Sequence, residues 1–310
     1  MTQTVFIDGA VGTTGLEIGG RLADRSEFDL IRLPEDQRKD ASARREAINA
    51  SDFVILCLPD DAAKQAVSLI DNPNTRVIDA SSAHRTAPDW VFGFAEFRDG
   101  QREKIASARF VSNPGCYPTG FLGLVAPLID QGLLSADWPY TVHAVSGYSG
   151  GGKALIERFG EEVDIGIRSY GLNLEHKHMP EMKRHAGLQH DVIFSPAVIR
   201  AYRGMLVEVP LNLAAMGCDA RADQLLATLQ DHYAGSPIVS VSSGEGLTEL
   251  MLNEDDPATD RLELFVFANA AGDQVRLMAR LDNLGKGAAG STVQDLNIMA
   301  GLEQTAGLRL

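Results

Sequence analysis

Short apolar runs alternate with amphipathic segments through the first third of the chain. Leu16, Ile18 and Leu22 have helical spacing, and a second helical pattern runs from Asp61 to about Ile70. Runs of consecutive apolar residues, the pattern of strands buried on both faces of a parallel sheet, precede and follow these helices. The predicted strands are 4–8, 30–33, 51–59 and 76–79. Strands that alternate with helices indicate a doubly wound α/β fold, whose ligands bind at the carboxyl ends of the strands.

The pattern changes in the second half, where strands follow one another at closer spacing. Two helices are predicted at 121–131 and 222–233, and a last helix lies within 287–301. This arrangement is typical of an α+β domain with a mainly antiparallel sheet. The predicted strands are 140–145, 191–199, 206–213, 262–269 and 274–281.

Length and charge narrow the classes of function. The 310 residues suggest two domains, and 45% hydrophobic residues are ordinary for a globular protein. A net charge of −14 makes nucleic acid and anionic membranes poor partners. Three separated cysteines form no disulfide framework, and no secretory signal or apolar run of membrane-spanning length is present. We therefore expect a soluble, cytoplasmic protein of two domains.

A glycine-rich turn follows the first predicted strand and precedes the first helix. Its sequence from Gly9 to Gly15 is Gly-Ala-Val-Gly-Thr-Thr-Gly. Glycines permit a tight turn and close approach of a phosphate to the helix N-terminus. The position after the first strand favours a dinucleotide site over a structural turn in some other α/β fold.

The segment after the second strand bears on which dinucleotide binds. Arg32, Arg38 and Lys39 suit the 2′-phosphate of NADP, whereas Glu35 and Asp36 would suit the 2′-hydroxyl of NAD. The sequence favours NADP, with a solvated loop of mixed charge as the alternative. Further residues at the carboxyl ends of predicted strands are Pro59, Ser81, Ser82 and Arg85.

Cys116 is the cysteine best placed for chemistry. It lies in Ser-Asn-Pro-Gly-Cys-Tyr-Pro-Thr-Gly, residues 112–120, at or just before the start of an apolar helix. A helix N-terminus favours the thiolate, and the same N–H groups could hold an oxyanion. The alternative is a small residue that merely fits a turn. Cys57 lies inside an apolar strand and is expected to be a core residue.

A cluster of histidines begins at Asn173-Leu-Glu-His-Lys-His-Met-Pro-Glu-Met182. A histidine here could act as general base beside Cys116. The alternatives are a zinc site, although no further ligands lie at a usual spacing, and a polar helix start with Pro180 in its first turn.

A third stretch, Val145 to Lys153, is rich in glycine and serine and precedes a predicted helix. It could hold a phosphate or the nicotinamide ribose through Ser149 and Gly150. A flexible loop between domains would have the same composition.

Taken together, these stretches resemble the N-acetyl-gamma-glutamyl-phosphate reductase family, in particular its shorter, type 2 form, within the aspartate-semialdehyde-dehydrogenase-like superfamily. The resemblance extends along the whole chain. It rests on the glycine turn, the Asn-Pro-Gly-Cys-Tyr segment, His-Lys-His-Met-Pro-Glu from His176, and Asn-Leu-Gly-Lys-Gly-Ala-Ala-Gly from Asn283. It implies an NADP-binding Rossmann domain over 1–115, completed by the C-terminal helix at 284–310. It also implies a catalytic and oligomerisation domain over 116–283, and a homo-tetramer.

The resemblance further implies an activity in arginine biosynthesis, the reductive dephosphorylation of N-acetyl-glutamyl 5-phosphate. Cys116 would form a thioester and release inorganic phosphate, NADPH would reduce that thioester to the semialdehyde, and His178 would be the base, with His176 as the alternative. Candidate substrate-binding residues are Arg85, Asn113, His176 and Arg203. The expected cofactor-binding residues are Gly9, Val11, Gly12, Thr13, Thr14, Gly15, Arg32, Arg38, Pro59, Ser81, Ser149, Gly150 and Asn283.

Three other functions remain open from the sequence. The same chemistry could act on aspartyl phosphate, as in aspartate-semialdehyde dehydrogenase. A non-catalytic nucleotide-binding regulator would keep the glycine turn without needing Cys116. A zinc hydrolase would use the histidine cluster.

Overall fold

The computed structural model describes residues 2–310, which divide into two compact units. The first unit contains the chain as far as Ala95 together with Asp99–Pro114 and Ala288–Leu308. The second unit contains Glu96–Arg98, Gly115–Gly287 and Arg309–Leu310. Among residues 2–310, no helix combines the length and the apolar character needed to cross a membrane.

A six-stranded sheet forms the centre of the first unit, in the order β2-β1-β3-β4-β6-β5. Every pair of neighbouring strands is parallel, so their carboxyl ends share one edge. The strands are β1 (Gln3–Asp8), β2 (Phe28–Ile31), β3 (Phe53–Leu56), β4 (Arg76–Asp79), β5 (Val91–Phe92) and β6 (Phe110–Ser112).

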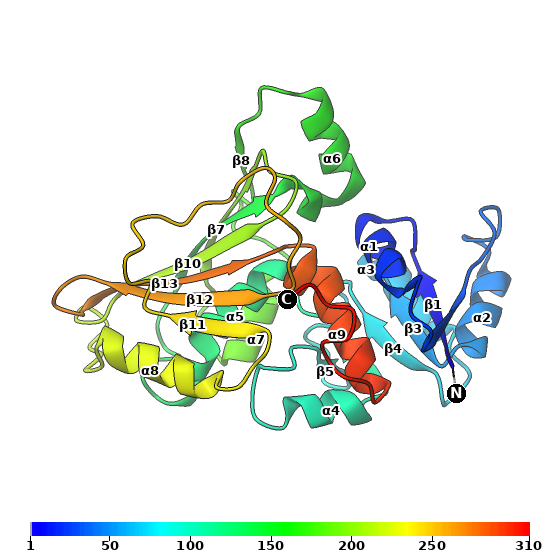
Figure 1. Cartoon of the computed structure of the whole chain (residues 1–310), viewed down its shortest axis with the longest axis horizontal. Coiled ribbons are helices and arrows are strands. Elements are labelled where there is room, and N and C mark those ends of the chain that lie inside the picture. Colours follow the sequence, from blue (N-terminus) through cyan, green and yellow to red (C-terminus); the bar gives the residue numbers. More distant parts are fainter. Residues whose placement is uncertain (1) are drawn as a thin grey trace. The chain divides into compact units, whose positions relative to one another are not determined.

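Helices cover both faces of this sheet (Figure 1). They are α1 (Thr13–Leu22), α2 (Ala41–Ala50), α3 (Asp60–Ser68), α4 (Gln101–Ser107) and α9 (Gly290–Met299). One apolar cluster joins α1, α4 and α9 to the sheet, and another joins α2 and α3 to it. Val293 and Leu296 of α9 are fully buried in the first cluster, so the C-terminal helix is part of the same unit as β1.

The second unit contains a seven-stranded sheet in the order β11-β12-β13-β10-β7-β9-β8. Its pairs are antiparallel except β11–β12 and β7–β9. The strands are β7 (Thr141–Gly147), β8 (Ile167–Ser169), β9 (Ile193–Ile199), β10 (Met205–Asn212), β11 (Val239–Ser242), β12 (Leu262–Ala268) and β13 (Gln274–Leu281). The predicted fold class, a parallel α/β domain with a mainly antiparallel α+β domain, is confirmed.

Helix α5 forms the core of the second unit. It packs against β10, β12 and β13, and every residue from Tyr117 to Leu128 is buried. The other helical segments of this unit are η1 (Tyr148–Gly151), α6 (Gly152–Glu161), α7 (Met179–Ala186) and α8 (Ala222–His232). A π-helical segment, Gly285–Ala289, leads into α9.

Several element boundaries differ from those predicted. Helix α5 begins at Cys116 rather than at 121, because a proline such as Pro118 is tolerated in the first turn of a helix. Strand β2 ends at Ile31, before the turn in which Gln37 N–H donates to the Pro34 carbonyl. The predicted helix over 287–301 is the end of the π-helical segment followed by α9.

Candidate active site

Cys116 is the first residue of α5, as its motif predicts. Gly115 is the N-cap in extended conformation (φ −72°, ψ 151°), and its carbonyl accepts bonds from the Thr119 N–H and hydroxyl, both at 2.9 Å. The Gly115 N–H donates to Oε1 of Glu181 at 2.8 Å, and Glu181 is 1% exposed. Cys116 itself is partly exposed. The positive end of a 15-residue helix favours its thiolate form.

Gly287 lies against Cys116. A Cβ added to it would lie 2.8 Å from Cβ of Cys116 and 3.1 Å from the Asp282 carbonyl oxygen. That carbonyl accepts hydrogen bonds from the N–H groups of Gly285 and Gly287, both at 3.0 Å, which closes the turn. The glycine-rich motif near the end of the chain therefore contacts the residue predicted to be the nucleophile.

The histidine motif forms the start of α7. His178 is the N-cap and is 6% exposed, and its N–H donates to Nδ1 of His176 at 3.1 Å. The Tyr117 ring lies 5.8 Å from the His178 ring and 6.0 Å from the His176 ring, centroid to centroid. The residue next to Cys116 thus packs against both candidate bases, although they are some 60 positions away in the sequence.

Two tyrosines near Cys116 were not identified from the sequence. The Tyr170 hydroxyl donates to the Tyr117 hydroxyl at 3.2 Å, and the Tyr117 hydroxyl donates to the Ala197 carbonyl at 3.3 Å. Burial raises the pKa of Tyr117 well above its usual value and that of Tyr170 to about 12, so both remain protonated donors at neutral pH. Tyr117 could have been noticed as the neighbour of Cys116, whereas Tyr170 stands in no motif.

Three residues predicted to contact the cofactor lie together in the second unit. The Asn283 side-chain amide donates to Oγ of Ser149 at 2.9 Å, and a Cβ on Gly150 would lie 3.4 Å from that same amide nitrogen. Oδ1 of Asn283 is buried and has no hydrogen-bond partner among the described residues. A buried acceptor of this kind fits a group that a bound ligand would donate to it.

The glycine turn in the first unit is formed by close approaches of the backbone. Gly9 has φ +91°, and a Cβ there would lie 2.3 Å from the Cys57 carbonyl oxygen. A Cβ on Gly15 would lie 2.4 Å from the Gly9 carbonyl oxygen, so both positions require glycine. Gly12 caps α1 without a side-chain bond, and the buried Thr13 hydroxyl has no partner in residues 2–310. Thr14 is partly buried in the first turn, and Val11 is 44% exposed.

The basic residues after β2 lie at the surface. Arg32 is exposed, and Arg38 forms an ion pair with Glu35 at 2.5 Å. An exposed pair of this kind contributes little to stability.

Arg85 is buried among main-chain carbonyls of the first unit. Its Nε donates to the Asn113 carbonyl at 3.0 Å and its Nη2 to the Ala80 carbonyl at 3.1 Å. These bonds tie the loop after β4 to the end of β6. Oδ1 of Asn113 is buried and, within the described residues, accepts no hydrogen bond. Asn113 thus has an acceptor available to a ligand, whereas two donors of Arg85 already serve the backbone.

The remaining predicted residues are held in well-defined positions. The Ser81 hydroxyl donates to Asp79 at 2.8 Å. Pro59 is the N-cap of α3. Nη1 of Arg203 donates to Oδ2 of Asp282 at 2.9 Å. That carboxylate also accepts the Leu284 N–H through Oδ1, so Arg203 is joined to the turn that contacts Cys116.

Comparison with known proteins identifies the family. Residues 4–108 match the family model of the semialdehyde dehydrogenase NAD-binding domain, and residues 116–283 match that of the semialdehyde dehydrogenase dimerisation domain. The chain is 49% identical to N-acetyl-gamma-glutamyl-phosphate reductase of Burkholderia orbicola, covering 98% of this chain and 99% of that protein. It is 46% identical to the enzyme of the same name from Trichormus variabilis, covering 98% of each. The chain belongs to the N-acetyl-gamma-glutamyl-phosphate reductase family.

Solved structures agree on the fold of this family. Aspartate semialdehyde dehydrogenase II of Vibrio cholerae superposes with a TM-score of 0.71 at 15% identity, covering 97% of this chain and 99% of that one. Aspartate semialdehyde dehydrogenase of Candida albicans, solved with NADP, gives 0.62 at 13% identity and covers 97% and 99%. The expectation of an oxidoreductase with a dinucleotide-binding domain is confirmed by the family models and the reductase relatives.

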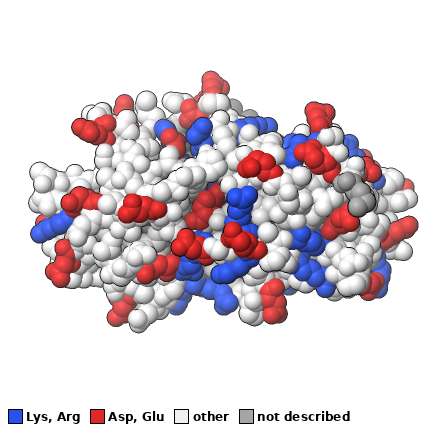
Figure 2. All heavy atoms as spheres, turned by 60° about the horizontal axis from the view of Figure 1, so that its bottom comes forward, with Lys and Arg blue, Asp and Glu red and all other residues white. Residues whose placement is uncertain are grey.

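The side chains that could hold a metal ion bear on the zinc hydrolase considered above, and the surface charge bears on possible partners. Within residues 2–310, no three His, Cys, Asp or Glu side chains are grouped so that they could hold a metal ion. The face seen in Figure 2 carries both acidic and basic side chains.

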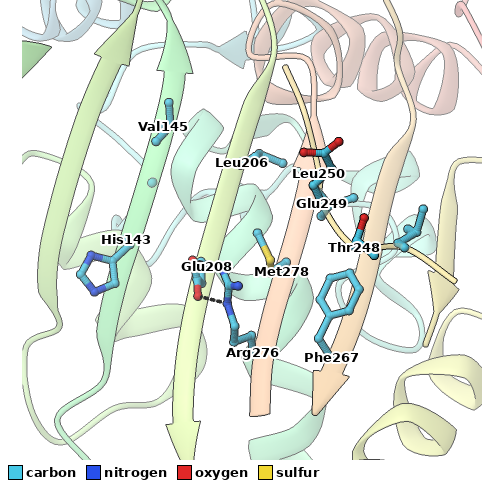
Figure 3. A pocket seen from close by; sticks show the side chains of 12 residues that line it. His143, Val145, Leu206, Glu208, Thr248, Glu249, Leu250, Phe267, Arg276 and Met278 are labelled. Carbon is cyan, nitrogen blue, oxygen red and sulfur yellow. Dashed lines mark hydrogen bonds and ion pairs between the residues drawn. The ribbon is translucent and has the colours of Figure 1, made fainter. Parts of the chain in front are cut away.

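A pocket on the seven-stranded sheet contains none of the predicted site residues. Figure 3 shows side chains of β7, β10, β12 and β13 and of the segment 247–250 around it. Glu208 and Arg276 form an ion pair across two strands there, at 2.5 Å. Phe267 and Met278 supply apolar surface beside that pair.

Proposed function

We propose that the chain is an N-acetyl-gamma-glutamyl-phosphate reductase of the shorter, type 2 form, acting in arginine biosynthesis with NADP. The observation that carries the proposal is the position of Cys116. It begins a buried helix, Gly287 contacts it, and the His176–His178 segment packs against the adjacent Tyr117. Relatives 46–49% identical over nearly their full length bear the name of this activity.

The chemistry begins at the Cys116 sulfur. His178 takes the thiol proton, and the thiolate attacks the acyl carbon of N-acetyl-glutamyl 5-phosphate. The bond between that carbon and the phosphate oxygen breaks, inorganic phosphate leaves, and a thioester remains. The positive end of α5 stabilises the negative charge that develops on the carbonyl oxygen.

When bound, a reduced nicotinamide dinucleotide supplies the hydride that reduces this thioester. Cys116 then leaves as thiolate when the tetrahedral adduct collapses to the semialdehyde. Expulsion of phosphate first yields an electrophile that accepts hydride, which a free carboxylate does not. His178 gives the proton it took from Cys116 to the oxygen of the departing phosphate, and the thiolate released in the second stage takes a proton from solvent to restore the thiol.

Residues of both units fit a dinucleotide. In the first unit, the turn from Gly9 to Gly15 and the Thr13 hydroxyl would hold phosphates, and Arg38 a 2′-phosphate. In the second, Ser149, Gly150 and Asn283 would hold the ribose of the nicotinamide. The remaining candidates for cofactor contact are Val11, Thr14, Arg32, Pro59 and Ser81.

The substrate is assigned to Asn113, Arg85 and Arg203, whose donors and acceptors suit carboxylate, amide and phosphate groups. His176, the fourth candidate from the sequence, is assigned to holding His178 in place. We assign NADP binding to residues 1–115 with 284–310, and catalysis and oligomerisation to residues 116–283. The match to a dimerisation domain supports an oligomer, and we propose a tetramer. A cytoplasmic location stays a prediction from the sequence.

The test is NADP reduction by N-acetyl-glutamate 5-semialdehyde, with and without inorganic phosphate, beside aspartate semialdehyde. We expect turnover of the acetylated compound that depends on phosphate. Turnover of the aspartate compound instead would keep the mechanism and replace the substrate. If neither compound is turned over while NADP still binds, a nucleotide-binding regulator would be favoured.

A further inference from the structure

We propose that His176 is a positioning residue for His178, acting as a neutral imidazole that accepts a main-chain hydrogen bond. The inference rests on the proposed function, since His178 is the base of that reaction. It decides between two histidines that the sequence leaves as alternatives. His178 is the base, and His176 holds His178 in position.

The hydrogen bond between the two histidines determines the tautomer of His176. The donor is the main-chain N–H of His178, and the acceptor is Nδ1 of His176 at 3.1 Å. An imidazole nitrogen that accepts carries no hydrogen, so the ring is neutral and its hydrogen lies on Nε2. In this state His176 has no lone pair left with which to take the thiol proton of Cys116.

Aromatic rings hold the His176 ring in this orientation. Phe194 lies 5.0 Å from it, Tyr170 5.6 Å and Tyr117 6.0 Å, all between centroids and all edge to face. The His178 ring stands 4.7 Å away, also edge to face. These rings come from β9, from the residue after β8, from α5 and from the N-cap of α7, so four separate elements fix the plane of His176.

The bond also fixes where α7 begins. His178 is the N-cap of that helix, with φ −88° and ψ −13°, and its carbonyl accepts the Met182 N–H at 3.1 Å. On the other side, Glu181 accepts the N–H of Gly115, which precedes Cys116. The His178 N–H is therefore held by His176, and the first turn of α7 is tied through Glu181 to the residue before Cys116.

The local geometry suggests a matched substitution. A side chain that accepts the N–H two residues later is the arrangement of an Asx turn. Oδ1 of asparagine is bonded to Cγ, as Nδ1 of histidine is, so His176→Asn keeps an acceptor in the same place. In His176→Gln the amide lies one bond further from the backbone and no longer occupies that position.

Activity of the three histidine variants tests the proposal. We expect His178→Asn to lower kcat by about 10²–10⁴-fold, as for loss of a general base. His176→Gln should lower kcat by about 10- to 100-fold with little change in KM, because a misplaced base slows the chemical step. His176→Asn should restore most of that loss, to within about threefold of the wild type.

Two results would overturn the proposal. One is a kcat of His176→Asn as low as that of His178→Asn, which would make the His176 imidazole itself the reacting group. The other is His176→Gln retaining the wild-type kcat, which would make the hydrogen bond irrelevant. If His176→Gln fails to fold by circular dichroism, the comparison of His176→Asn with His178→Asn decides alone.

Alkylation of Cys116 separates failure of this inference from failure of the proposed function. Labelling by iodoacetamide at pH 7, followed by peptide mass, reports thiolate formation without any substrate. We expect His178→Asn to slow it at least tenfold and His176→Asn to leave it within about threefold. If the wild type turns over neither semialdehyde, the proposed function fails, and the labelling rates still test the roles of the two histidines.

Discussion

Replacement of Gly287 by alanine tests the packing at Cys116, the residue proposed as the nucleophile. The added Cβ would lie 2.8 Å from Cβ of Cys116, whereas carbon atoms in contact are about 3.5–4.0 Å apart. The shortfall is about 1 Å, and either the turn or Cys116 must move by that amount. Helix α5 cannot retreat, because it is buried from Tyr117 to Leu128 and its N-cap is bonded to Glu181.

The expected cost follows from this displacement. Overpacking a close contact costs about 1–3 kcal/mol of stability. Misplacing a reacting group by about 1 Å costs on the order of 10²-fold in rate. Gly287→Ala should therefore fold, lose a modest part of its stability and lose about 10²-fold in kcat.

The assay combines thermal unfolding, turnover and labelling of Cys116 by iodoacetamide at pH 8. Burial, together with the carboxylates of Asp79 and Asp8, raises the pKa of Cys57 to about 12, so this thiol should stay unlabelled. The matched control is Gly160→Ala in α6, where a Cβ meets no atom within 4 Å of the described structure. It should gain about 0.4–1 kcal/mol and keep wild-type activity. Wild-type kcat and labelling in Gly287→Ala would refute the reasoning.

Three other substitutions test separate parts of the molecule. Cys116→Ser should abolish turnover while NADP binding, followed by calorimetry, is retained; residual turnover would remove Cys116 as nucleophile. Arg38→Ala frees Glu35 and should weaken NADP more than NAD, and equal weakening would show that Arg38 only lines the surface. Arg44→Met removes the partner of the buried Asp8 (2.8 Å) and should cost about 3–5 kcal/mol at pH 8. Burial already raises the pKa of Asp8, whereas Arg44 lowers it. The stability lost in Arg44→Met should therefore shrink as the pH falls and Asp8 is protonated. A loss of unfolding free energy in urea that stays the same at all pH values would contradict this.

The sequence predicts four of the six strands of the first sheet, β1 to β4, because each contains at least two consecutive apolar residues. It does not predict β5 or β6, which have two and three residues, or β8, in which Ile167 is 64% exposed, or the short strand β11. The sequence also does not predict that two strand pairs of the second sheet, β11–β12 and β7–β9, are parallel. Closely spaced strands suggest antiparallel neighbours, and only tertiary packing places β9 beside β7.

The candidate site shows a similar division. Cysteine and histidine are residue types that take part in catalysis, so the sequence predicts Cys116 and, with His176 as the alternative, His178 as candidates. Tyr170 could not be found, because its role depends on a contact with Tyr117, 53 positions away. The bond from Gly115 to Glu181 spans 66 positions, and nothing in the sequence pairs a helix-capping glycine with a particular glutamate.

Three buried oxygen atoms explain why the motifs contain residues that the fold alone does not need. Oγ1 of Thr13, Oδ1 of Asn113 and Oδ1 of Asn283 accept and donate no hydrogen bond within residues 2–310. Each such group costs roughly 1–3 kcal/mol relative to a satisfied one. An apolar residue of similar shape, such as valine for threonine, would remove that cost from the unliganded protein. Retaining a polar atom at such a position is understandable when a ligand supplies the missing partner, and all three stand where the sequence predicts contact with cofactor or substrate.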